Sequence, residues 1–182
     1  MPRPLLLFIH ITAAMGVFAA MGIEGVALLQ LRRASSLAQL QAAVNGLRLM
    51  QRVMALSALT LVLSGLYLAG SGWGWSVPWI NLGFASLVAA AVLGAATTGR
   101  TIGRVQAGAS DRASRSALDQ LRAPLLGISY RTRVAMLIGI VYLMTVKPAL
   151  GESLIVMTAA TAVGLAFGLR CLRLPVTPLV EG

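Results

Sequence analysis

Residues 4–31, PLLLFIHITAAMGVFAAMGIEGVALLQL, form an apolar run in which only His10, Thr12, Glu24 and Gln30 carry clearly polar side chains. An α-helix rises about 1.5 Å per residue, so about 20 apolar residues cross the ~30 Å hydrocarbon layer of a bilayer. The run is longer than this minimum, which allows the helix to tilt or to extend beyond the membrane. It therefore predicts a membrane-spanning helix. Since the run continues well past the small residues at which a signal peptide would be cleaved, we expect the helix to be retained.

His10 and Glu24 are the ionisable residues of this helix; His10 is the only histidine of the chain, and Glu24 is one of five acidic residues. At about 100° per residue, their spacing of 14 residues places them on one face of the helix, roughly 21 Å apart along its axis. The residues between them on that face are mostly small: Ala13, Ala14, Val17, Ala20 and Met21. We expect the face to pack against protein rather than lipid.

The composition is that of a polytopic membrane protein. Hydrophobic residues make up 58% and charged residues 11% of the chain, and the mean hydropathy is +0.84, which is too apolar for an ordinary soluble domain. The formal net charge of +10 comes from arginines in short segments between apolar runs, a pattern that argues against a nucleic-acid-binding face. The single cysteine, Cys171, excludes an internal disulfide and a cysteine cluster for zinc or iron–sulfur.

The fold predicted from the apolar runs is an all-α integral membrane protein, a single domain over residues 1–182 with about five transmembrane helices. The expected spans are 4–31, 50–69, 79–104, 130–147 and 152–172, followed by an extended tail at 174–182. Short amphipathic interfacial helices are expected at 34–51, which could instead continue into the second span, and at about 111–121. A four-span alternative makes the last two runs a re-entrant hairpin. In the last span, Ala160, Gly164 and Gly168 form a small-residue stripe suited to close helix packing.

The basic residues predict the orientation of these spans. In the five-span arrangement, all but Arg3 and Lys147 of the 15 lysines and arginines fall on one side of the membrane. Cytoplasmic loops carry the excess of positive charge, so the N-terminus is expected outside and the C-terminus in the cytoplasm. The predicted location is the bacterial cytoplasmic membrane.

This orientation gathers polar residues at the outer end of the bundle. His10 lies near the outer end of the first span, and the fourth span ends there with Tyr142, Met144 and Lys147. Imidazole and thioether groups are good ligands of copper and haem iron, so these four residues are the candidate cofactor-binding set, with His10 the candidate metal ligand. The tryptophans of the turn GSGWGWSVPW are interpreted mainly as an interfacial aromatic belt.

Glu24 is predicted to make a structural ion pair instead. It lies towards the cytoplasmic end of the first span, where arginines of other segments could reach it. The candidate partners are Arg52, Arg100, Arg104 and Arg133.

His10 within LLLFIHITAAMGVFAAMG, together with LMTVKP at the end of a late span, resembles small uncharacterised bacterial integral membrane proteins related to the CopD-like superfamily. Within that superfamily, HemJ, a protoporphyrinogen oxidase, also carries a first-span histidine and an intramembrane lysine. The resemblance implies a helix bundle with His10 pointing inward and links to haem or copper.

Three functions remain open from the sequence. The first is a non-enzymatic accessory or assembly subunit that packs in a homo-oligomer or a larger membrane complex, as the small-residue stripes suggest. The second is a haem-binding or haem-handling redox membrane protein that uses His10, with haem b as the cofactor; if the protein is an enzyme, it would be a membrane oxidoreductase. The third is a permease for copper or another small solute. The expected partners are the lipid bilayer and membrane subunits, and no nucleic acid.

Overall fold

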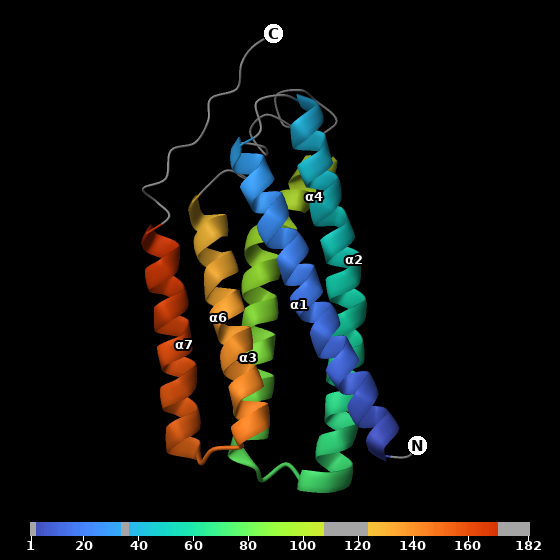
Figure 1. Ribbon diagram of the computed structural model, residues 1–182, viewed down its shortest axis with the longest axis vertical. Helices are drawn as coiled ribbons and strands as arrows, with labels where there is room; N and C mark the ends of the chain where they lie inside the picture. The colour runs from blue at the N-terminus through green and yellow to red at the C-terminus, as the bar shows by residue number, and fades with distance from the viewer. Residues whose placement is uncertain (1–2, 34–36, 108–123, 171–182) are drawn as a thin grey trace.

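The structure is a computed structural model that describes residues 3–33, 37–107 and 124–170, and all regular elements in these ranges are helices (Figure 1). The elements are α1 (Arg3–Arg33), α2 (Leu37–Leu68), η1 (Ala69–Trp73), α3 (Pro78–Gly94), η2 (Ala95–Gly99), α4 (Arg100–Ala107), α6 (Pro124–Val146) and α7 (Leu150–Arg170). Here η denotes a π-helical turn.

Five helices are long and apolar enough to cross a membrane, as the sequence predicts. They are Arg3–Arg33, Ala42–Gly72, Pro78–Gly103, Pro124–Val146 and Leu150–Arg170. They run alternately up and down, so that the N-terminus and the α2–α3 and α6–α7 turns lie at one end of the bundle (Figure 1). Because α6 and α7 each have the length of a span, the structure favours five spans over four.

The segment at 34–51 does not form a separate surface helix in its described part. From Leu37 onwards it belongs to α2, which continues into the second span without a break at Gly46. The physical reason is burial: Ala43, Val44 and Leu47 pack in a hydrophobic cluster with α1 and with Ile102 of α4. The expected helix at 111–121 and the tail at 174–182 lie outside the described residues.

Helix α6 begins at Pro124, earlier than the expected start at 130. The fixed φ and missing N–H of proline suit the first turn of a helix, so Pro124 can begin α6. At the other end of α6, Lys147 adopts a left-handed conformation with φ 56°, and its amide donates to the carbonyl of Leu143 at 3.0 Å. The chain then turns directly into α7, where the Ser153 hydroxyl donates to the carbonyl of Pro148 at 3.2 Å.

The small-residue stripe of α7 packs against α6 of the same chain. A Cβ atom at Gly164 would lie 2.7 Å from the Cα of Thr132, and one at Gly168 would lie 2.8 Å from the Cα of Ile128. These glycines therefore allow the two backbones to approach closely. The stripe closes this bundle, so it is not available as a contact surface for a second copy.

Candidate functional site

A buried ion pair joins α1 to α6. Arg133 donates from Nη1 to Oε2 of Glu24 at 3.0 Å and from Nη2 to Oε1, which makes the pair bidentate. The side chains are 7% and 0% exposed, respectively. Arg133 is thus the one of the four candidate arginines that contacts Glu24 in the described part of the chain. Its Nη1 also lies 3.8 Å from the sulfur of Met21.

Thr98 adds a third helix to this centre. Its hydroxyl donates to Oε1 of Glu24 at 2.7 Å and lies 3.4 Å from Nη2 of Arg133. The preceding residue, Thr97, shares a hydrogen bond of 2.9 Å with Ser129 of α6. Both threonines belong to the π-helical turn η2, whose i→i+5 bonding widens the helix. In this wider turn, two consecutive hydroxyls contact other helices: that of Thr97 contacts α6 and that of Thr98 contacts α1.

Gly94 makes room for the arginine. A Cβ atom at this position would lie 3.0 Å from Nη1 of Arg133 and 3.4 Å from its Cδ. Sequence reasoning placed Gly94 among the small residues of the third span that allow close helix contact, but it did not connect Gly94 with Arg133, and it missed Thr98. The available signal was the segment GAATTG within an otherwise apolar run, since hydroxyls and glycines at membrane depth mark close polar helix contacts.

The centre is arranged to hold helices together. A charge at membrane depth is stable only where an opposite charge and hydrogen bonds replace its hydration, and Glu24 has both. By contrast, Nε of Arg133 is buried and has no hydrogen-bond partner among the described residues. The charge-assisted hydrogen bonds of this centre therefore join three segments, α1, η2 and α6.

His10 lies at a second polar centre, between α1 and α2. Its Nδ1 is 3.0 Å from the hydroxyl of Ser64, which in turn donates to the carbonyl of Thr60 at 2.6 Å and lies 3.2 Å from that of Leu61. The Ser64 hydroxyl has one proton and three possible acceptors, which are the two carbonyls and Nδ1, so the donor in the His10–Ser64 bond depends on the imidazole tautomer.

A groove adjoins this centre. It has a volume of about 340 Å³ and is lined by Leu6, Ile9, Thr60, Leu63, Ser64 and Tyr67. The half-buried His10 ring fits closely because Gly65 has no side chain: a Cβ there would lie 3.1 Å from Cε1 of the imidazole.

The other candidate cofactor residues lie at different places in the bundle. Met144 packs against α3: a Cβ atom added at Gly83 would lie 2.8 Å from Cε of Met144. His10 packs against α2 instead. Tyr142 is exposed, and Lys147 is exposed at the end of α6. The structure therefore does not bring His10 and Met144 to one helix interface. Within the described ranges, no group of three or more His, Cys, Asp or Glu side chains could hold a metal ion.

The tryptophans of the α2–α3 turn differ from one another. Trp75 is exposed, and its carbonyl accepts from the Asn81 amide at 2.8 Å. Trp79 is instead buried in the cluster that α3 forms with α6 and α7. Trp79 is therefore a core residue rather than part of an aromatic belt.

Comparison with known proteins finds no family model, no curated protein and no solved structure that matches this chain.

Proposed function

We propose that this protein is a non-enzymatic accessory or assembly subunit of the bacterial cytoplasmic membrane, a multi-pass bundle that packs in a homo-oligomer or a larger membrane complex. The observation that supports a structural role over a solute path is how α1 is packed between its two polar centres. Ala13, Val17, Ala20 and Met21 are buried there, and Val17 and Met21 pack with Leu137 of α6.

This packing favours a scaffold over a permease. A solute path needs polar groups that follow one another across the bilayer. Here His10 and Glu24 are separated by roughly 21 Å of helix whose inward face is filled with apolar side chains. At both centres the polar groups bond to neighbouring helices, which stabilises a fixed bundle.

The arginines support the proposed orientation, with the N-terminus outside and the C-terminus in the cytoplasm. Arg32 and Arg33 end α1, Arg100 begins α4, and Arg170 ends α7, all at the end of the bundle opposite the N-terminus (Figure 1). By the positive-inside rule that end faces the cytoplasm.

The size of the native assembly tests the proposal. We expect membranes solubilised in a mild detergent, at native expression level, to release the protein in particles well above the 19.0 kDa chain plus its detergent belt. Liposomes containing the purified protein should show no flux of copper or small solutes above protein-free liposomes. Release of monomers only, or a flux that the protein induces, would contradict the accessory function.

One observation favours a second candidate, a haem-handling protein that uses His10. The hydrogen bond between Nδ1 and the Ser64 hydroxyl orients the imidazole, and such an orienting bond is typical of imidazoles that ligate metals. An optical spectrum of the gently purified protein distinguishes the two. A Soret band that disappears in His10→Ala supports haem binding, whereas a colourless preparation without iron or copper eliminates it.

A further inference from the structure

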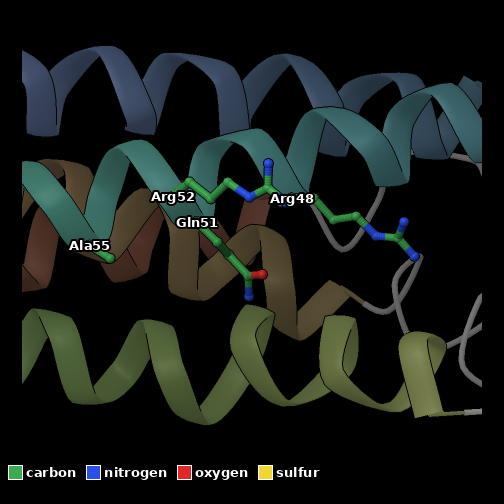
Figure 2. A pocket seen from close by; sticks show the side chains of 4 residues that line it. All are labelled: Arg48, Gln51, Arg52 and Ala55. Carbon is green, nitrogen blue, oxygen red and sulfur yellow. The ribbon is translucent and has the colours of Figure 1, made fainter.

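A polar groove opens on α2, on the side that faces the α3–α4 column. Its volume is about 600 Å³, and its lining residues are Arg48, Gln51, Arg52 and Ala55 (Figure 2). In Figure 2, Gln51 extends from α2 towards the α3–α4 ribbon. The side chains of both arginines run along α2 towards its N-terminal end, which is the arginine-rich end of the bundle.

The two arginines bring positive charge to the groove, and neither acidic residue in the described part of the chain lies beside them. They are one helical turn apart and both are exposed. Of the acidic residues that the structure describes, Glu24 pairs with Arg133, and Glu152 lies in the first turn of α7 at the other end of the bundle. Like charges at this spacing destabilise a helix unless an anion lies between them.

The arginines also lie well inside the apolar length of the bundle. Gly46, two residues before Arg48 in α2, packs next to Ala27 of α1. A Cβ atom added at Gly46 would lie 3.6 Å from the Cβ of Ala27. Further along, Gly16 of α1 contacts Ser57 of α2. Arg48 and Arg52 therefore lie level with the middle part of α1 that includes Glu24. A guanidinium group at this depth of a membrane needs a counter-charge or must extend towards the membrane surface. In Figure 2 both arginine side chains run towards the N-terminal end of α2, the end at which the proposed orientation puts the cytoplasmic surface.

The same helix offers an apolar surface next to the charged groove. In the apolar 18-residue stretch of the second candidate span, Ala42–Gly72, only 11% of the residues are buried. In the corresponding stretch of α6, 39% of the residues are buried. Leu56, Leu59 and Leu63 are each more than half exposed and follow the arginines along α2. A ligand that covers both regions has an anionic head and an apolar tail.

We propose that this groove binds the phosphate group of an anionic phospholipid, with the acyl chains lying along the exposed leucines of α2. Guanidinium groups bind phosphate oxygens in a bidentate manner, and the Gln51 amide adds a neutral donor. The apolar surface distinguishes a lipid from free phosphate. The inference does not depend on the accessory function, since a permease or a haem protein with this bundle would carry the same groove.

Native mass spectrometry of the full chain in detergent tests this site, with phosphatidylglycerol, phosphatidylcholine and inorganic phosphate as separate probes. We expect a one-to-one phosphatidylglycerol adduct that phosphatidylcholine does not match and that inorganic phosphate does not displace. At about 1 kcal/mol for each arginine near anionic lipid, Arg48→Gln/Arg52→Gln should weaken phosphatidylglycerol binding about 30-fold, and each single substitution about fivefold.

A matched control removes the same charge elsewhere. Arg33→Gln/Arg170→Gln changes two exposed arginines at the same end of the bundle, outside the groove, and should leave the adduct within about twofold of the wild-type protein. Arg48→Lys/Arg52→Lys keeps the charge and loses the bidentate guanidinium geometry, so its affinity for phosphatidylglycerol should lie between those of the glutamine double variant and the wild-type protein. This variant separates loss of the site from loss of the fold. Equal binding of the two lipids, displacement by inorganic phosphate, or equal losses in the groove and control variants would overturn the proposal.

Discussion

Replacing Glu24 with glutamine is the most informative change to the bundle. The substitution keeps the size of the side chain and removes its charge, so Arg133 loses its counter-ion in a site where the carboxylate is fully buried. Three interactions depend on that carboxylate: the two bonds from Arg133 and the 2.7 Å bond from Thr98. Removing one partner of such a buried pair costs about 3–5 kcal/mol of the free energy of unfolding.

Equilibrium unfolding in mixed dodecyl maltoside and SDS micelles measures this cost, with the intrinsic tryptophans as the fluorescent probe. Glu152→Gln is the control, because it neutralises an exposed acid at the other end of the bundle and should change the free energy of unfolding by less than about 0.5 kcal/mol.

A double substitution tests the reason for the cost. Glu24→Met/Arg133→Met removes both charges and fills the site with apolar atoms, so it should be clearly less destabilised than Glu24→Gln, by about 2 kcal/mol or more. The reasoning is refuted if Glu24→Gln unfolds within about 0.5 kcal/mol of the wild-type protein, or if the double variant is less stable than the single one.

Other predictions concern the packing of α7 and the threonines of η2. Gly164→Ala should destabilise the bundle by about 1–3 kcal/mol, because the new methyl group meets the backbone of α6, whereas Gly151→Ala, which has open space around it, should have little effect in the same unfolding assay. Thr97→Val breaks the hydrogen bond to α6 and should lower the free energy of unfolding by about 1 kcal/mol. Thr158 is an exposed threonine that bonds to its own helix, so Thr158→Val should lower it by less than half as much. Equal losses would argue against the interhelical bond.

The fold could be predicted from the sequence because long apolar runs and their charged ends carry most of the information. Helices that cross a bilayer must satisfy their backbone groups internally, so length and hydropathy largely determine where they run. The predictions were weakest at helix ends. Helix α6 starts at Pro124 and not at 130, and the segment before Met50 is stabilised as part of α2 by packing against α1 and Ile102 of α4.

The candidate sites depended on which helices meet, and a single sequence does not determine this. Glu24 was recognised as an acid in need of a cation, but four arginines were equally good partners until α1 was packed against α6. His10 and Met144 lie near the same end of the bundle, and nothing in their spacing shows that one packs against α2 and the other against α3. The segment GAATTG marked a polar helix contact near Thr98, but the spacing of its residues does not show that Thr98 would reach Glu24 of α1.

The central claim is that five helices cross the membrane with the arginine-rich end in the cytoplasm, and cysteine labelling in intact cells tests it most directly. In a Cys171→Ser background, single cysteines replace Ser71, in the α2–α3 turn, and Ser114, in the segment between α4 and α6. A membrane-impermeant maleimide should label the cysteine at position 71 in intact cells and the one at position 114 only after permeabilisation. The reverse pattern, or labelling of both positions in intact cells, would contradict the account.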